Sequence, residues 1–596
     1  MSHNLSSNNI GQPKEKQLPR QRALVLQGGA AMGAYEAGVY RVLYDWIYRQ
    51  IKDEENVFDI LAGTSIGSIN SAILLNHVLK RRKEQGITNK KSWECSAEKL
   101  EKFWTKDTST LTTAESPLFE HWWNYMYGLV PNAATSGQAR RHYSVKQLKT
   151  FGAINVFSPK LPFKQDTKFF DYSANNPVLY WARYTNEPLK NIIRKHYWDD
   201  KKYPIKTKSE NNQPRLLVIS IDVEAGRTVA FDSYGKVKRD QNNKHILKDE
   251  NGDVLYSWQT EYEDGDDNIT IEYPNGIQLD HVIASSTVPI NYDYTVIKVK
   301  DKKGNETSRF FWDGQYISST PLREIINAHQ KYWKDNIESK LGYQGLEDKI
   351  TSVDQQDRYG IPNLDVYVVN VWPTKEKPAP QDHDGQLNRK NDIIFHDKTV
   401  YEEKIANLVN DYADLTRDLI EILKKNAVIE GKTKEIEKKL KDLLHKTGKS
   451  KSRRDKPRTY LEILTGGFII ERIMRVELAS DHDTISEKWA DYSRRTISVL
   501  LDEGKKDALK TLTNNLRKSI DAGLQDPITN KKPSAEIRNR LSAHLRETDD
   551  LLKNYEPSKY GVIMNKLWSF IDLVNKMKSE DDKIGLTPNQ SSLLLP

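Results

Sequence analysis

The first part of the chain alternates short apolar runs with longer stretches of helical periodicity. Residues 22–27 form an aliphatic run that ends at a pair of glycines, and residues 57–62 form a second one that ends at Gly63. Residues 33–51 and 66–81, which follow these runs, carry apolar positions at intervals of three and four. The pattern predicts strand, glycine turn and helix, twice over. This βαβα order is typical of a parallel sheet with right-handed crossovers, so we expect an α/β fold.

Strand patterning returns further along the chain. We expect buried strands at 216–223 and 364–371, antiparallel hairpins within 227–275, and a strand that ends at Asp313-Gly314. A helix with proline at its start should cover 321–332. Residues 87–212 are less regular and read as an insertion over the sheet. They include an aromatic cluster that consists of Phe119, Trp122, Trp123, Tyr125 and Tyr127. The cluster would be either part of the core or a membrane-facing lid, the latter because Trp and Tyr favour membrane interfaces.

The C-terminal part of the chain follows another period. Apolar residues from Tyr401 to Ile422 recur at steps of four and three, which is the a/d seam of a coiled coil over three heptads. The register continues to Leu443 with a break at Gly431, so one long helix or a two-helix hairpin fits. The seam within residues 401–443 would mediate self-association or pack against the chain's own C-terminal helices. Residues 460–478 have strand-like apolar content, and the remainder to about residue 580 is helical and charged.

Composition and charge exclude several classes of protein. One cysteine, Cys95, in 596 residues rules out a disulfide framework and cysteine-based metal sites within the chain. The net charge of +8 is local, because residues 424–458 alone carry 14 Lys+Arg and 5 Asp+Glu. We therefore expect no nucleic-acid partner; the basic stretch 446–458 would be a solvated linker or attract anionic lipid headgroups.

No segment predicts membrane insertion or secretion. The most apolar run, residues 60–75, is shorter than a spanning helix and contains Ser and Thr, and the N-terminus has no apolar signal region. The expected location is cytoplasmic, with the option of peripheral membrane attachment. The 13 histidines show no metal-binding spacing, and we expect neither a metal nor a cofactor. His281 is expected to have an ordinary structural role.

The sharpest chemical motif is Gly63-Thr64-Ser65-Ile66-Gly67, a Gly-x-Ser-x-Gly sequence between a predicted strand and a predicted helix. This is the context of a nucleophile elbow, in which Gly63 and Gly67 let strand and helix close up around the serine. Ser65 would then lie at a helix N-terminus, where peptide dipoles favour developing negative charge. The alternative is a plain strand-to-helix turn.

A second glycine motif, Gln27-Gly28-Gly29-Ala30-Ala31-Met32-Gly33, lies between the first strand and the first helix. Backbone N–H groups at such a turn can accept an oxyanion or a phosphate. Ala30 stands where a dinucleotide fingerprint needs glycine, and no Gly-Lys-Ser/Thr follows. We favour an oxyanion hole, with a close strand–helix turn as the alternative. Asp313, at a strand end, is the candidate base for Ser65.

Four motifs in order complete the pattern: Gly28–Gly33, Gly63–Gly67, the segment Ala284-Ser285-Ser286-Thr287-Val288-Pro289, and Asp313-Gly314. In order and context they resemble the patatin-like phospholipases, in particular the bacterial branch with a C-terminal extension. The resemblance covers about residues 22–330 and the strand near 364–371. It implies a three-layer core with a central, mostly parallel sheet flanked by helices, plus a largely helical C-terminal region.

The resemblance also implies a chemistry. Ser65 would be the nucleophile and Asp313 the base of a Ser–Asp dyad, with an oxyanion hole formed by the N–H groups of Gly28, Gly29 and Ala30. The implied reaction is hydrolysis of fatty acyl esters of phospholipids or related lipids through an acyl-enzyme, with transient contact at a membrane surface. The alternative is a catalytically weak relative that binds lipid or membrane through its C-terminal helices.

Three residues depart from the family pattern. Ala30 replaces the third loop glycine, Met32 stands where an Arg or Lys is usual, and Gln315 replaces the Gly or Ala after Asp313-Gly314. Each could lower activity or change the lipid accepted. A free carboxyl titrates near 4, so Asp313 should be a poor base by pKa and act through close contact with the serine, burial and a dry pocket.

The predicted domain organisation follows from these patterns. We expect a flexible tail over 1–20, a patatin-like catalytic domain over 21–375 with its insertion at about 87–212, and a heptad-patterned segment with a basic linker over 376–459. A strand and helical region over 460–580 and a second flexible tail over 581–596 complete the chain.

Overall fold

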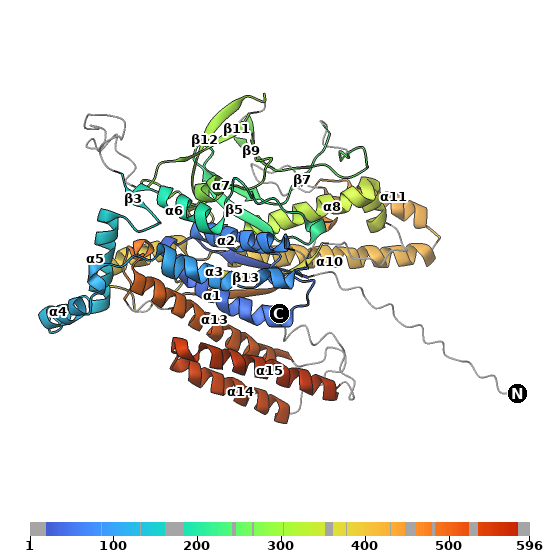
Figure 1. Ribbon diagram of the computed structural model, residues 1–596. Coiled ribbons are helices and arrows are strands. Elements are labelled where there is room, and N and C mark those ends of the chain that lie inside the picture. The colour runs from blue at the N-terminus through green and yellow to red at the C-terminus, as the bar shows by residue number, and fades with distance from the viewer. Residues whose placement is uncertain are drawn as a thin grey trace. The chain divides into compact units, whose positions relative to one another are not determined.

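The computed structural model describes residues 20–84, 86–131, 133–160, 184–240, 246–264, 267–301, 303–351, 361–376, 378–429, 431–447, 459–465, 468, 470–479, 483–523 and 535–581 (Figure 1). They divide into two compact units. The larger unit contains Arg22–Asn327, Asp365–Lys404 and the chain from Arg472 onward. The smaller unit contains Ala328–Leu364 and Ile405–Glu471, together with the start of the first strand.

Three adjacent parallel strands form the centre of the sheet. They are β1 (Arg20–Leu26), β2 (Ile60–Thr64) and β5 (Arg215–Asp222), with Leu61 paired to Leu24 on one side and to Leu216 on the other. Helix α1 (Gly33–Gln50) connects β1 to β2, and α2 (Ile66–Arg82) follows β2. Because successive crossovers run in one direction and are right-handed, α1 and α2 lie on the same face, where they contact each other.

Further strands extend this centre on both sides. The order in the described part of the sheet is β14-β13-β1-β2-β5-β12-β11-β10-β9, and β6 also pairs with β5. Beyond β5, each successive pair is antiparallel. The added strands are β6 (Arg227–Asp232), β9 (Gln259–Asp264), β10 (Asp267–Glu272), β11 (Thr295–Lys300), β12 (Glu306–Asp313), β13 (Asn363–Asn370) and β14 (Ile470–Glu477). Two short ladders, β3 (Ser158–Pro159) with β4 (Tyr184–Thr185) and β7 (Lys236–Val237) with β8 (Tyr256–Ser257), stand apart.

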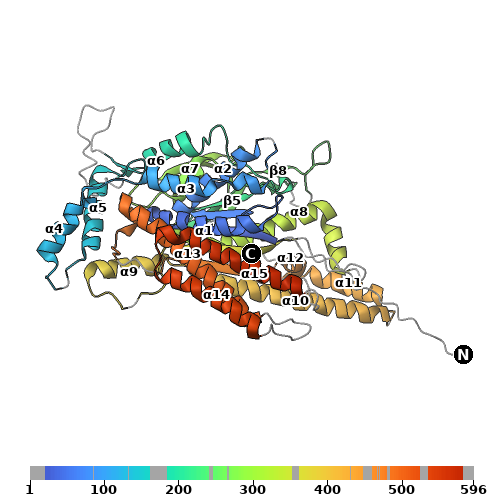
Figure 2. The same cartoon turned by 60° about the horizontal axis from the view of Figure 1, so that its bottom comes forward.

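The C-terminal helices belong to the core of the larger unit. Helices α13 (Arg494–Gly523), α14 (Ala535–Lys553) and α15 (Tyr560–Asp581) lie side by side (Figures 1 and 2), and α13 packs along α1. A Cβ on Gly38 would lie 2.0 Å from the Leu501 carbonyl oxygen, and one on Gly504 would lie 2.2 Å from that of Tyr35. The backbones of the two helices therefore approach each other too closely at Gly38 and Gly504 for any side chain to fit there. The predicted fold class, a mostly parallel central sheet flanked by helices with a helical C-terminal region, is confirmed.

The insertion supplies helices rather than loops alone. Helix α3 (Ser96–Lys102) packs on α1 and α2, and Trp93 and Trp104 are fully buried. Helices α4 (Pro117–Tyr127) and α5 (Ser136–Phe151) form a hairpin, and α6 (Glu187–Ile192) follows. No residue of α4 is buried. The interpretation of its aromatic cluster as core is therefore wrong.

Four further helices complete the description. Helix α7 (Leu279–Ser285) packs on β5 and β12, α8 (Leu322–Thr351) extends well beyond the predicted residues 321–332, and α9 (His383–Phe395) was not predicted. Residues 460–478, expected to be strand-like throughout, begin with helix α12 (Tyr460–Thr465) before β14. Residues 1–19 and 582–596 of the two predicted tails, and residues 448–458 of the basic linker, lie outside the described residues.

The heptad segment is a hairpin of α10 (Val400–Ile429) and α11 (Thr433–Leu444), separated at Gly431. Its small core consists of Ile420, Leu440, Leu444, Leu461 and Leu464. The seven seam residues from Tyr401 to Ile422 are instead 42–70% exposed. Within the described residues nothing of this chain covers the seam, and self-association remains a prediction. The compact units also divide the chain differently from the predicted domains, because residues 472–581 belong with the sheet.

Candidate active site

Ser65 lies at a sharp turn between β2 and α2. Its backbone has φ 54° and ψ −124°, a left-handed conformation that is strained for a residue with a side chain. A Cβ on Gly63 would lie 2.2 Å from the Gly67 carbonyl carbon, and one on Gly67 would lie 2.3 Å from the Leu26 carbonyl oxygen. Only glycine fits at either position. The turn has the strained geometry expected of a nucleophile elbow.

The sheet brings Asp313 to this turn. Asp313 ends β12, which is separated from β2 only by β5. The Ser65 hydroxyl donates a hydrogen bond of 2.5 Å to Asp313 Oδ2, and the Gln315 N–H donates one of 2.9 Å to Oδ1. Ser65 is 3% exposed and Asp313 is fully buried. The two residues predicted as a dyad are therefore in direct contact in a site with little exposure to water.

Burial changes the acidity of this carboxyl. It raises the pKa of Asp313 to about 7, although the hydrogen bonds from Ser65 and from the Gln315 N–H act in the opposite direction. The expectation that Asp313 would be a poor base by pKa is therefore wrong. A carboxyl that titrates near neutral pH is matched to proton transfer at that pH.

The Ala284–Pro289 segment supports both residues. The Ser65 N–H donates to Ser285 Oγ at 2.8 Å, and the Ser285 hydroxyl donates in turn to the Ile219 carbonyl of β5. The Asp313 N–H donates to the Thr287 carbonyl oxygen at 2.9 Å. Sequence reasoning quoted this segment without giving Ser285 a role. The structure makes it a brace for the elbow.

The glycine loop follows β1 beside the dyad. The Gly28 N–H is 3.4 Å from the Ser319 carbonyl oxygen, whereas the N–H groups of Gly29 and Ala30 have no hydrogen-bond partner among the described residues. Ala30 has φ 49°, a conformation that glycine adopts more readily. The alanine at the family's third glycine position therefore carries strain. Of the three predicted donors, Gly29 and Ala30 are the ones available to an oxyanion.

Trp372 fixes the orientation of this loop. Its indole N–H donates to the Gly28 carbonyl oxygen at 2.6 Å. In a trans peptide the C=O and the following N–H point in opposite directions, so this bond also orients the Gly29 N–H. Gln27 Oε1 accepts from the Val371 N–H at 2.8 Å and so ties the end of β1 to the same segment. Sequence reasoning gave neither residue a role. It quoted Gln27 only as the first residue of the glycine motif, and a glutamine closing an aliphatic strand was the available signal.

A buried ion pair lies next to the Trp372 ring. Lys488 Nζ is 2.6 Å from Asp392 Oδ1, with both side chains at most 2% exposed, and 5.2 Å from the centroid of the Trp372 ring. Lys488 belongs to a 3-10 turn (Lys488–Ala490) that packs on the turn Ala30–Met32 of the glycine loop. Met32 itself is fully buried. The C-terminal part of the chain thus contributes to the surroundings of the glycine loop.

Comparison with known families decides the relationship. The family described as patatin-like phospholipase matches residues 24–326, just over half of the chain. The chain belongs to this family. The patatin-like domain contains the glycine loop, the elbow, the Ser285 brace and Asp313, and membership supports lipid hydrolase activity in general.

Comparison with individual proteins adds little. VipD from Legionella pneumophila is 10% identical in sequence, with 95% of this chain and 85% of that chain covered at a TM-score of 0.28, which carries no structural argument. The curated proteins gave no match. Within the described residues, no helix of this patatin-like protein is long and apolar enough to cross a membrane.

The third departure from the family pattern lies directly at the site. A Cβ on Gly28 would be 2.5 Å from Gln315 Oε1 and 3.1 Å from Ser65 Cβ. The Gln315 side chain therefore covers Gly28 next to Ser65. A smaller residue, as in the family pattern, would leave this space open.

His281 takes no part in this constellation. Its Nδ1 accepts from the Gln278 N–H at 3.0 Å, which caps α7, and its ring packs against Phe231. Burial lowers the pKa of His281 to about 4. Among the described residues no group of three or more His, Cys, Asp or Glu side chains could hold a metal ion.

Proposed function

We propose that this protein is a lipid acyl hydrolase that cleaves fatty acyl ester bonds of phospholipids or related lipids with Ser65 as nucleophile and Asp313 as base. The observation that carries the proposal is the 2.5 Å hydrogen bond from the Ser65 hydroxyl to a fully buried carboxyl whose pKa is raised to about 7. Family membership supplies the lipid ester as the class of substrate.

The reaction runs in two halves. Asp313 accepts the hydroxyl proton while Ser65 Oγ attacks the ester carbonyl carbon, and the carbonyl oxygen becomes an oxyanion. Collapse of this intermediate expels the alcohol, which takes the proton from Asp313, and leaves the acyl group on Ser65. Asp313 then removes a proton from water, which attacks the acyl-enzyme. Release of the fatty acid returns the proton to Ser65.

The oxyanion is stabilised by the N–H groups of Gly29 and Ala30, which have no partner within the described residues. Each such donor contributes about 100- to 1000-fold to the rate in comparable sites, because it is oriented before the charge develops. The low exposure of Ser65 and Asp313 strengthens these interactions by excluding water. Besides substrate and water, this mechanism uses only residues of the chain. A lipid substrate requires transient contact with a membrane surface, which the protein would make from the cytoplasmic side.

The test is Ser65→Ala, assayed by mass analysis of fatty acids released from a mixed lipid extract. The variant should lose at least about 1000-fold in rate, since the nucleophile is removed. Ser71→Ala is the matched control: Ser71 is a buried serine of α2 whose hydroxyl has no hydrogen-bond partner among the described residues, and its loss should change the rate less than about twofold. Release at the wild-type rate by Ser65→Ala would refute the proposal.

A further inference from the structure

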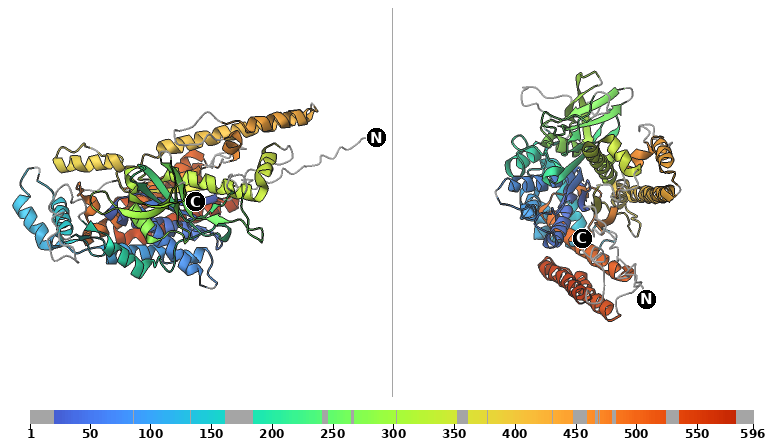
Figure 3. Two further views of the ribbon diagram at one scale, coloured as in Figure 1. Left: turned by 90° about the horizontal axis from the view of Figure 1, so that it is seen from above. Right: turned by 90° about the vertical axis from the view of Figure 1, so that its right-hand side faces the viewer.

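Helix α4 projects from the rest of its unit in Figures 1 and 2 and in the left view of Figure 3. None of the 11 residues of α4 is buried. Leu129, at the tip, is fully exposed, Tyr125 is 83% exposed and Leu118 is 78% exposed. Trp122, Met126 and Val130 are about half exposed. Exposed apolar surface of this extent is unusual for a protein surrounded only by water.

The exposed residues form one stripe. Leu118, Trp122, Tyr125 and Met126 follow one another at steps of four, three and one, so they share one side of the helix, and Leu129 follows in the turn after it. The opposite side, with Phe119, Trp123 and Tyr127, packs within the hairpin and reaches Tyr143 of α5, with Phe119 and Tyr143 ring centroids 5.2 Å apart. Residues 117–131 carry Glu120 and His121 but no Lys or Arg.

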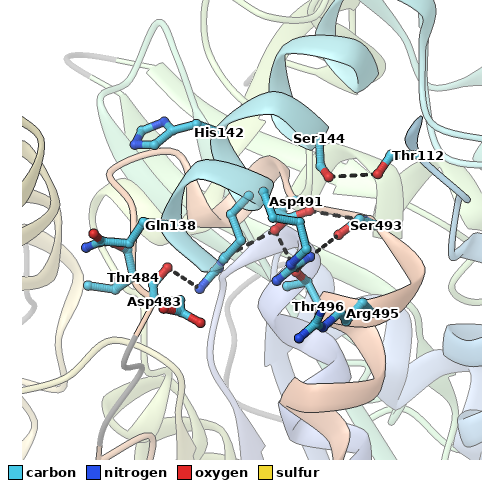
Figure 4. A network of polar contacts seen from close by, with 12 residues as sticks. Thr112, Gln138, His142, Ser144, Asp483, Thr484, Asp491, Ser493, Arg495 and Thr496 are labelled. Atoms are coloured by element: carbon cyan, nitrogen blue, oxygen red, sulfur yellow. Dashed lines mark hydrogen bonds and ion pairs between the residues drawn. The ribbon is translucent and has the colours of Figure 1, made fainter. Parts of the chain in front are cut away.

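The base of the hairpin is fixed by buried polar contacts (Figure 4). Arg141 Nε of α5 donates to Asp491 Oδ2 at 3.1 Å, and the two side chains are 3% and 0% exposed. The Thr496 hydroxyl donates to the same Asp491 oxygen at 2.7 Å, and Arg140 Nη1 donates to Thr496 Oγ1 at 3.2 Å. Thr496 belongs to α13, which packs along α1. Helix α5 is therefore anchored to the core of the unit.

Helix α4 is braced as well. Ser116 Oγ caps its N-terminus by accepting from the Leu118 N–H, and the Trp123 indole N–H donates to the Ala134 carbonyl oxygen at 2.9 Å. Arg495 Nη1 is 3.0 Å from Glu120 Oε2. The polar groups of the hairpin thus hold it in place, and the apolar stripe is presented outward in a fixed orientation.

We propose that residues 118–130 form a membrane-contact arm that inserts the stripe into the interfacial region of a lipid bilayer. Trp and Tyr have the mixed apolar and polar character that suits this region, and Leu and Met supply apolar area below it. The inference rests on the proposed function for its ligand, because a lipid substrate has to be reached at a bilayer. Since the arm has no Lys or Arg, contact does not depend on anionic headgroups.

The experiment measures partition of the full-length protein onto phosphatidylcholine vesicles by co-flotation. Tyr125→Glu with Leu129→Glu should weaken partition at least about tenfold, because charges replace the most exposed apolar side chains. Asn124→Glu is the matched control, since it adds a charge at an exposed polar position of the same helix and should change partition less than about twofold. Raising NaCl from about 0.1 to 0.5 M should leave wild-type partition within about twofold.

Three results would refute the proposed membrane contact: no binding of the wild type to these vesicles, equal binding by the double variant, or binding that salt abolishes. The last result is the one expected if the basic stretch 446–458 were responsible for binding. A soluble short-chain ester separates this inference from the proposed function. The double variant should hydrolyse that ester at the wild-type rate and lose hydrolysis of vesicle lipid. If neither protein hydrolyses any ester but partition follows the pattern above, the arm stands and the hydrolase proposal fails.

Discussion

Replacing Asp313 by asparagine should abolish hydrolysis and at the same time stabilise the larger unit at alkaline pH. Asparagine has nearly the same shape, and it can contact both hydrogen-bond partners of the carboxylate, with the direction of the bond to Ser65 reversed. Its Oδ1 would accept from the Gln315 N–H, and its amide would donate to Ser65 Oγ, which are the two partners seen in the structure. What the variant lacks is a proton-accepting group and a buried negative charge.

The size of the stabilisation follows from the pKa of Asp313, which burial raises from 3.8 to about 7. At about 1.4 kcal/mol for each pKa unit, the shift corresponds to about 4 kcal/mol. Below pH 4 the carboxyl is protonated in both the folded and the unfolded protein. Between pH 4 and 7 only the unfolded chain loses the proton, so the free energy of unfolding falls as pH rises. The loss is complete above pH 7.

The assay is urea unfolding of wild type and Asp313→Asn at pH 5 and pH 8. The gain in unfolding free energy of the variant over wild type should be larger at pH 8 by about 2.5 kcal/mol, the part of the linkage that falls between these pH values. Asp442→Asn, at an exposed position of α11, should show no such dependence on pH. An equal difference at both pH values for Asp313→Asn would refute the raised pKa and the reasoning built on burial.

Three further outcomes are expected. For a soluble ester, kcat/KM should rise with pH with an apparent pKa near 7 and lie about 100-fold below its plateau at pH 5, because Asp313 must be ionised; a flat profile from pH 5 to 8 would contradict this. Trp372→Phe should lower kcat about tenfold or more with little change in KM, because the Gly29 N–H loses its orientation for the transition state; an increase in KM alone would argue against that role. Leu408→Glu with Leu415→Glu should convert a self-associated protein to monomer in sedimentation equilibrium, whereas a wild type that is monomeric at micromolar concentration would rule out association through the exposed α10 seam.

The local parts of the site were predictable because their signals are local. A strand, a glycine-flanked serine and a helix occupy adjacent residues, so Ser65 could be placed at a turn before any contact was known. The order of the motifs then paired Ser65 with Asp313, and the strand order β2-β5-β12 explains the pairing physically. The βαβα opening was predictable for the same reason, since its apolar periods are long and regular.

Properties set by distant residues were not predictable in this way. The pKa of Asp313 depends on how completely the folded chain excludes water, which no short motif encodes. Trp372 contacts the glycine loop from 344 positions away in the sequence, and Lys488 lies near it from about 460 positions away. No short sequence motif can therefore indicate their roles. Residues 460–465 are a short apolar run that suits a strand or a helix equally, and they form a helix.

The exposure of the α4 arm was also not predictable from the sequence. A cluster of Trp and Tyr has the composition of a protein core, and only the absence of any covering element within the described structure distinguishes it from one. The C-terminal helices illustrate the same limit. The sequence predicted that they are helical, whereas the crossing of α13 and α1 at Gly38 and Gly504 depends on the backbone distance between elements.

The nucleophilic role of Ser65 is tested most directly by covalent labelling with a fluorophosphonate, followed by peptide mass mapping. The wild type should carry the label on Ser65, Ser65→Ala should carry none, and Asp313→Asn should be labelled at least about 100-fold more slowly because the hydroxyl keeps its proton. Label that persists in Ser65→Ala, or an unlabelled wild type that still releases fatty acid from lipid, would contradict the assignment.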